Sequence, residues 1–204
     1  MPSWARTFGF AMVSGTIASA TSSLALAFLA RLEGRGALQP VNATSHWWNG
    51  DQAASFREAD IAHTAVGYTT HHAATIFWAV FYERLIGPRR PVAALPLLGD
   101  ALIISAVSAA VDYGATPRRF TPGWEFVLSK KSMAAAYGAM ALGLAMGAFM
   151  TQRSVPSRGQ GRLGQAEVPT VPLRVPLAFP GWRASRPEGA RRAVGGSRAS
   201  ATRG

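Results

Sequence analysis

The stretch from Ile61 to Leu85, IAHTAVGYTTHHAATIFWAVFYERL, is an apolar segment that carries three of the chain's four histidines. As a helix, it is long enough to cross a hydrocarbon core of about 30 Å. Ionisable side chains are costly inside such a segment unless they have a partner or face a polar cavity. The stretch therefore predicts a transmembrane helix whose polar faces point into a bundle.

The titratable groups of this stretch are expected on more than one face. At about 100° per residue, His71 aligns with Tyr82, whereas His72 aligns with Glu83. His63 lies about 80° from His71 and close to one membrane interface. The helix is therefore expected to carry titratable groups along much of its depth.

Composition favours a membrane protein. The chain has 49% hydrophobic and 15% charged residues, and the charges cluster at the ends of apolar blocks. The net charge is +11, but ten of the 21 basic residues follow Gln152 and no nucleic-acid motif accompanies them. We therefore expect the partner of this chain to be the lipid bilayer, including anionic lipid. We expect no nucleic acid as a partner. The lack of cysteine excludes disulfides and thiolate metal sites.

Three further apolar segments complete the predicted membrane domain. They cover residues 8–30, 92–113 and 132–151. With residues 61–85 they predict an all-α integral membrane bundle of four transmembrane helices over residues 1–151. Residues 152–204, rich in Arg, Pro and Gly, predict a disordered tail. A cleaved signal peptide is the alternative for the first segment, although its apolar run continues beyond the site at Ala25–Ala27.

Small residues recur every four positions on the first and fourth predicted helices. Such stripes favour close helix packing and are compatible with a homo-oligomer. The first stripe comprises Ala11, Gly15, Ser19, Ser23 and Ala27, and the second comprises Ala135, Ala139, Gly143 and Gly147.

The third predicted helix contains two carboxylates, Asp100 and Asp112, in an otherwise apolar run. Ser105, Ser108 and Asp112 share one face by their spacing. We expect Asp112 to face the second helix, with His71 or His72 as its partner, because lipid would leave the carboxylate unsatisfied.

The connections are expected at the aqueous faces. Residues 31–60 form a polar connection in which His46-Trp47-Trp48 is either an interfacial anchor or a segment that places His46 over the mouth of the bundle. Residues 114–131 suit a segment lying along the interface. With four crossings both termini share a side. The arginine-rich tail then predicts a multi-pass inner-membrane protein with both termini cytoplasmic.

Two quoted segments carry a resemblance to a known group of proteins. These are HTAVGYTTHHAATIFWAVFYE at His63–Glu83 and PRRFTPGWE at Pro117–Glu125. With them, the first 150 residues resemble a family of uncharacterised small bacterial four-helix inner-membrane proteins. The resemblance implies the architecture and supplies neither an activity nor catalytic residues.

The ionisable and hydroxyl side chains within the predicted helices define a candidate polar intramembrane cluster. Its members are His63, His71, His72, Glu83, Asp100, Ser105, Ser108 and Asp112. His63, His71 and His72 are the candidate ligands for a metal or haem, although their spacing matches no familiar metal motif. Hydrogen bonding between helices is the simpler interpretation, with no cofactor.

Three functions remain open from the sequence. The leading hypothesis is a non-enzymatic membrane protein with a structural, assembly or accessory role, without catalytic residues. A haem- or metal-binding redox protein is the first alternative. A proton or small-solute path through His71, His72, Glu83 and Asp112 is the other, because such relays use these residue types.

Overall fold

The structure, a computed structural model, describes residues 3–153, and this part of the chain is helical without strands. Its four long helices are α1 (Trp4–Leu32), α4 (Val66–Ile86), α5 (Ala94–Gly114) and α6 (Lys130–Gln152). The expected all-α class is thus confirmed for these residues. The tail prediction concerns residues that, from 154 onward, lie outside the described part.

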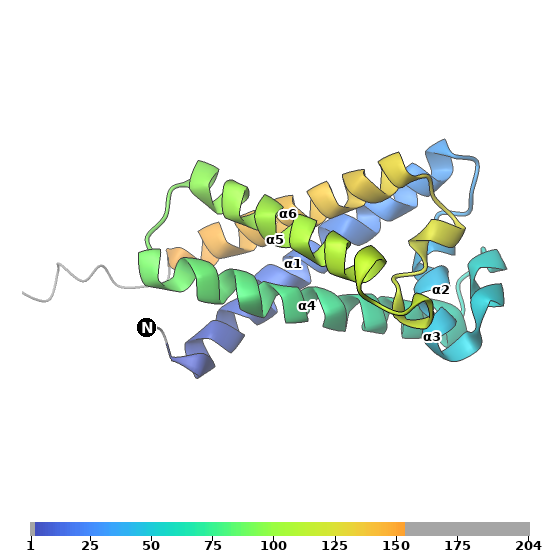
Figure 1. The fold of residues 1–204 in the computed structure, drawn as a ribbon, viewed down its shortest axis with the longest axis horizontal. Helices are drawn as coiled ribbons and strands as arrows, with labels where there is room; N and C mark the ends of the chain where they lie inside the picture. The colour runs from blue at the N-terminus through green and yellow to red at the C-terminus, as the bar shows by residue number, and fades with distance from the viewer. Residues whose placement is uncertain (1–2, 154–204) are drawn as a thin grey trace, which may run out of the picture. The chain divides into compact units, whose positions relative to one another are not determined.

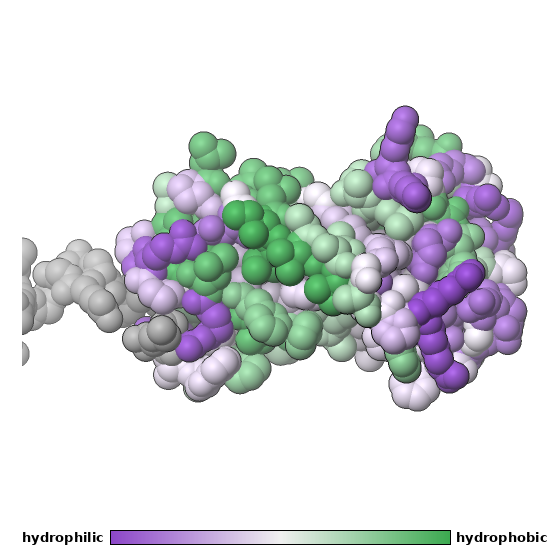
Figure 2. Space-filling model, in the orientation of Figure 1, coloured by the Kyte–Doolittle hydropathy of each residue, from purple (hydrophilic) through white to green (hydrophobic). Residues whose placement is uncertain are grey.

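Three of the four predicted spans are confirmed as helices long and apolar enough to cross a membrane: α1, α5 and α6. α4 is comparably long, but its histidines, threonines and charged residues leave it outside this set. The surface is consistent with a membrane protein. Figure 2 shows a band of hydrophobic residues between two more hydrophilic ends.

The four long helices run alongside one another in alternating directions (Figure 1). α1 packs against α4 and α6, and α5 packs against the same two helices. One end, here called the turn end, contains the short connection from Gly87 to Ala93 together with the start of α1 and the end of α6. The opposite end, the loop end, contains residues 33–65 and 115–129.

α6 approaches α1 through two glycines of its predicted stripe, and they lie against Ser14 and Ala18, which are small residues outside the stripe predicted on α1. A Cβ atom added to Gly147 would lie 2.4 Å from Ser14 Cα, and one added to Gly143 would lie 2.4 Å from Ala18 Cα. On the other side of α1, a Cβ on Gly15 would lie 2.8 Å from Ile76 Cα of α4. The two stripes therefore bring helices of the same chain together.

The connection from α1 to α4 is folded rather than a simple polar loop. It forms α2 (Gln39–Thr44), α3 (His46–Asn49), a 3-10 turn η1 (Asp51–Ser55) and a π-helical turn η2 (Ile61–Ala65) that leads into α4. All six residues of α2 are buried. A Cβ on Gly67 of α4 would lie 2.0 Å from Val41 O. Only glycine therefore lets α2 lie against the start of α4.

The connection from α5 to α6 covers the same end. It contains the short turns η4 (Arg118–Phe120) and η5 (Trp124–Phe126). Trp47 Nε1 donates to Thr121 O at 2.7 Å, which links this connection to α3. Gly123 has φ +81° and would clash through a Cβ with Ala43 O, so this turn requires glycine.

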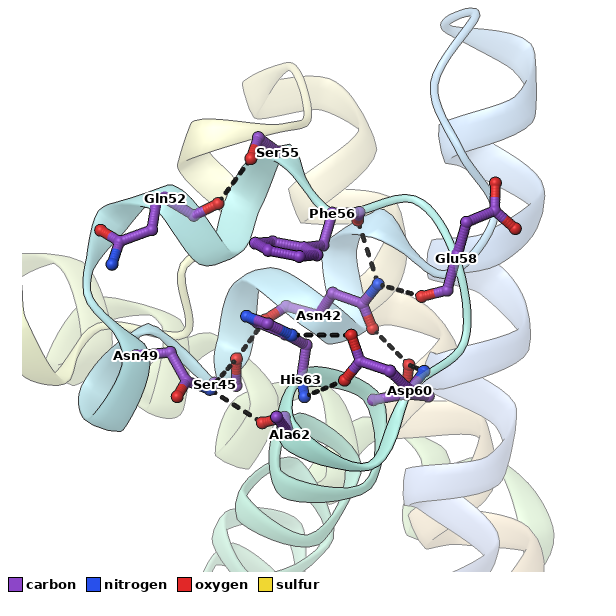
Figure 3. A network of polar contacts seen from close by, with 11 residues as sticks. Asn42, Ser45, Asn49, Gln52, Ser55, Phe56, Glu58, Asp60, Ala62 and His63 are labelled. Atoms are coloured by element: carbon purple, nitrogen blue, oxygen red, sulfur yellow. Dashed lines mark hydrogen bonds and ion pairs between the residues drawn. The ribbon is translucent and has the colours of Figure 1, made fainter.

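A polar network fixes the start of α4 at the loop end (Figure 3). Asn42 Nδ2 donates to Phe56 O and to Glu58 O, both at 3.0 Å. Asn42 Oδ1 accepts from Thr64 Oγ1 at 2.7 Å. One buried amide from α2 therefore holds both the chain that leads into η2 and η2 itself.

The glycine contact between α1 and α6 predicts a position-specific effect of added volume. We expect Gly147→Ala to lower the free energy of unfolding by about 1–3 kcal/mol, because its methyl group would overlap Ser14 of α1. Unfolding in mixed detergent measures the change. Gly138→Ala, on the same helix with no atom within 4 Å of the added Cβ, is the matched control. Equal stability of Gly147→Ala and Gly138→Ala would contradict the packing argument.

Candidate functional site

A cavity of about 860 Å³ lies at the loop end, bordered by α4 and α5, by α6 and by both connections. α4 contributes Val66, Ala73 and Ala74 to its wall, and α5 contributes Val111 and Asp112. Its lining is mainly apolar, and several large apolar lining side chains are exposed on the surface of the molecule. These are Trp48, Ile61, Phe77, Val111 and Phe120.

Trp124 of η5 joins the elements that form the inner wall of the cavity. It is 2% exposed, and its Nε1 donates to Thr44 Oγ1 of α2 at 3.2 Å. Its ring centroid lies 5.5 Å from that of His71 and 5.3 Å from that of Tyr137. One tryptophan of residues 114–131, the connection predicted to lie along the interface, is thus buried in the bundle.

His71 is the histidine that lines the cavity, and it is held by α1. Its Nε2 lies 2.9 Å from Ser22 Oγ of α1. The Ser22 hydroxyl also lies within hydrogen-bonding distance of Ala18 O, at 2.7 Å, and of Ser19 O, at 3.2 Å. A hydrogen on His71 Nε2 is compatible with this set of contacts, because Nε2 then donates to Ser22 while the hydroxyl donates to a carbonyl.

Asp112 also lines the cavity, but its partner differs from the one expected. Its Oδ2 accepts a hydrogen bond from Tyr137 Oη of α6 at 2.6 Å. The prediction of a His71 or His72 partner is therefore wrong. The hydrogen-bond donor to the carboxylate comes from α6 rather than from α4. Among residues 3–153 the one hydrogen bond to the Asp112 carboxylate ends on Oδ2 and leaves Oδ1 without a donor.

The wall contains both engaged and unengaged hydrogen-bond donors: the indoles of Trp48 and Trp78 and the hydroxyls of Thr69 and Thr116 donate to no atom of residues 3–153. Seven lining side chains direct a hydroxyl or indole hydrogen to an oxygen atom of the protein. They are Thr44, Trp47, Thr70, Thr75, Ser108, Trp124 and Tyr137. No lysine or arginine lines the cavity in the part of the chain that the structure describes. The cavity is thus an apolar space with a carboxylate in its wall.

His63 lies outside the cavity, in the polar network of the loop end. Its Nδ1 lies 2.8 Å from Asp60 Oδ2, its backbone N–H donates to Asp60 Oδ1, and Phe56 stacks on its ring at 3.7 Å (Figure 3). The hydrogen bonds from His63 lower the pKa of the Asp60 carboxyl. His63 therefore acts together with Asp60 as part of the cap on η2.

The other two histidines also make local contacts. His72 stacks on Tyr68 with ring centroids 5.8 Å apart, one turn away on the same helix. His46 is 3% exposed, and its Nδ1 lies 2.9 Å from Ala43 O. His46 is therefore a buried packing residue, while the adjacent Trp47 and Trp48 line the cavity; the role of this segment as an interfacial anchor stays a prediction.

The two remaining carboxylates of the predicted cluster lie at the turn end. Glu83 pairs with Arg90, and both side chains are almost fully buried, at 1% and 5% exposure. The Arg90 guanidinium lies over the Phe10 ring, and burial lowers its pKa. Asp100 pairs with the more exposed Arg89 at 2.6 Å. The basic turn after α4 thus neutralises one carboxylate from α4 and one from α5.

The structure therefore separates the predicted polar cluster. It brings His71, Ser108 and Asp112 to one cavity, while His63, His72 and the turn-end carboxylates lie elsewhere. Sequence reasoning missed Tyr137 and Trp124. The lone tyrosine in the fourth predicted span was the available signal for Tyr137, because a phenol in a membrane helix also seeks a partner.

The candidate metal ligands do not converge. Among the described residues no group of three or more His, Cys, Asp and Glu side chains could hold a metal ion. His71 Nε2, the usual ligand atom, is engaged by Ser22. A metal or haem held by the three histidines of one chain would therefore need a rearrangement.

Comparisons with known proteins add no relative: no protein-family model, no curated protein and no solved structure matches this chain.

The two ion pairs at the turn end predict unequal effects of charge removal. We expect Glu83→Gln to lower the free energy of unfolding by about 3–5 kcal/mol, because it leaves Arg90 buried without a counter-charge. Asp100→Asn is the matched control and should cost about 0–1 kcal/mol, since Arg89 is half exposed. Detergent unfolding of both variants measures the difference. A Glu83→Gln variant as stable as Asp100→Asn would refute the argument.

Proposed function

We propose that this chain is an integral membrane protein that crosses the bilayer four times and binds an apolar molecule in the cavity between α4 and α5. The role is that of a binding or accessory protein rather than an enzyme. The cavity is the observation that carries the proposal, because its apolar lining and its exposed apolar rim suit a molecule that arrives from the hydrocarbon phase.

The geometry of α4 supports a fourth crossing. Its 21 residues correspond to about 32 Å at 1.5 Å per residue, close to the thickness of a hydrocarbon core. It connects the loop end to the turn end alongside α1, whose two ends lie at the same two levels (Figure 1). Two of its polar residues are paired with other parts of the bundle, Glu83 with Arg90 and His71 with Ser22. A helix that is less apolar overall can therefore cross.

The orientation and location form part of the same proposal. Four crossings place the start of α1 and the end of α6 on one side of the membrane. The ten arginines that follow Gln152 favour the cytoplasm for that side. The resemblance to small bacterial four-helix proteins supports an inner membrane as the location.

Single introduced cysteines test the fourth crossing, and the chain has no cysteine of its own. We expect a membrane-impermeant thiol reagent to label Arg57→Cys and Arg119→Cys from one side and Arg6→Cys from the other. All three positions are exposed in the structure. Cells and inverted vesicles give the two sides. Labelling of Arg57→Cys and Arg6→Cys from the same side would show that α1 does not cross as proposed, and a split between Arg57 and Arg119 would exclude four crossings.

Filling the cavity tests the binding function. We expect Ala74→Trp to reduce binding of tritiated triphenylmethane, a neutral hydrocarbon, because the indole would occupy the cavity between α4 and α5. Binding is measured by equilibrium dialysis of protein in lipid nanodiscs against empty nanodiscs. Ala20→Trp, on an exposed position of α1 outside the cavity, is the matched control.

Two outcomes would contradict this function. Wild-type nanodiscs that bind no more triphenylmethane than empty nanodiscs would do so. Equal binding by Ala74→Trp and Ala20→Trp, with both proteins monodisperse and helical, would show that the hydrocarbon binds elsewhere.

A further inference from the structure

The wall of the cavity is asymmetric in charge. Among the residues that line it, Asp112 is the one carboxylate in the described part of the chain, and no lysine or arginine accompanies it there. An anionic occupant would therefore meet a carboxylate without a compensating base. A cationic occupant would meet an opposite charge in a space of low dielectric constant.

The hydrogen bonds of Asp112 leave room for a ligand. Tyr137 donates to Oδ2, and none of the hydrogen bonds among residues 3–153 ends on Oδ1. Tyr137 also fixes the carboxylate, because its phenol is 7% exposed and is packed against Trp124. The site thus presents a carboxylate that Tyr137 holds through one oxygen and whose other oxygen can still accept a hydrogen bond.

The rest of the wall points to the same class of ligand. Seven hydroxyl and indole donors of the wall bond to protein oxygens, whereas those of Trp48, Thr69, Trp78 and Thr116 donate to no atom of residues 3–153. The wall also contains the aromatic side chains of Trp47, Trp78 and Trp124, and the faces of such rings attract cations. The carboxylate of Asp112 thus lies in a wall that is rich in aromatic rings and lacks lysine and arginine among the residues described.

We propose that the occupant of the cavity is an apolar organic cation whose charged group lies beside Asp112. This inference rests on the proposed binding function and names the chemical class of its ligand. A membrane lipid with an ammonium headgroup fits less well, since its phosphate would find no basic partner in the lining. A free hydrophobic amine or phosphonium ion has no such anionic group.

Two ions of the same shape and opposite charge test the proposal. Tetraphenylphosphonium and tetraphenylborate both present four phenyl rings around a central charge. Binding of each tritiated ion to wild-type protein in phosphatidylcholine nanodiscs is measured as the excess over Ala74→Trp nanodiscs, which removes partitioning into lipid. We expect saturable excess binding of the phosphonium ion, and at least about tenfold weaker binding of the borate ion.

The carboxylate itself is tested by substitution. We expect Asp112→Asn to lower the ratio of phosphonium affinity to triphenylmethane affinity by about tenfold, while Asp112→Glu retains most of that ratio. The ratio corrects for general damage to the cavity, which would weaken the binding of both ligands. Asparagine at position 112 can still accept the hydrogen bond from Tyr137. Asp51→Asn, the same change at an exposed position outside the cavity, should leave the wild-type ratio unchanged.

The possible failures are distinguishable. In the first case, triphenylmethane binding is sensitive to Ala74→Trp, but the two ions bind with equal affinity or Asp112→Asn leaves the ratio unaltered. This result overturns the proposal of a cationic ligand and leaves the proposed binding function standing. In the second case, triphenylmethane does not bind, or its binding is insensitive to Ala74→Trp. This result overturns both the binding function and the cationic ligand. Native mass spectrometry that finds a zwitterionic phospholipid retained by wild-type protein and absent from Ala74→Trp also overturns the cation in favour of a lipid.

Discussion

The loop end of the bundle depends on the burial of Trp124. Its indole contacts His71 of α4 and Tyr137 of α6, and its N–H bonds to Thr44 of α2. One side chain therefore links both connections of the loop end to α4 and α6. Since burial of a large aromatic side chain is among the more stabilising contacts available, this residue fixes the inner wall of the cavity as well as the cap above it.

Several polar groups within the helices are paired with a group from a neighbouring helix or turn, while Ser19, His72 and Ser105 keep buried polar atoms without a partner among the residues described. Ser22 bonds to His71, Tyr137 bonds to Asp112, and Arg90 neutralises Glu83. Such local pairing is what a low-dielectric surrounding demands, because an unpaired buried charge costs more than an ion pair. It also explains why the predicted cluster is divided. His71, Glu83 and Asp112 each have a separate partner on another helix or turn, so they do not form one larger polar centre.

The cavity arises where this pairing and packing are incomplete. The glycine contacts that bring α1 against α6 and α4 have no counterpart between α4 and α5, because an added Cβ on either glycine of α5, Gly99 or Gly114, would meet nothing within 4 Å. Large side chains such as Phe77 and Trp78 line the cavity there. The only charged group in the wall there, among the residues described, is Asp112. Close packing on one side of the bundle and a gap on the other thus produce an apolar site with a single charge.

The sequence by itself determined the helices and the pattern of close approach. Apolar length predicted α1, α5 and α6, and the four-residue spacing of Gly143 and Gly147 predicted a tight contact, because both signals are local and repeat with the helix. Only the tertiary structure decided the partners. Asp112 meets Tyr137, 25 positions away, and His71 meets Ser22, 49 positions away. Helical periodicity gives the face of a side chain on its own helix, whereas the identity of the facing residue depends on the relative rotation and depth of two helices. The folded connection over residues 33–65 escaped prediction for the same reason, since α2 is held by Gly67 and Trp124 rather than by a strong helical pattern of its own.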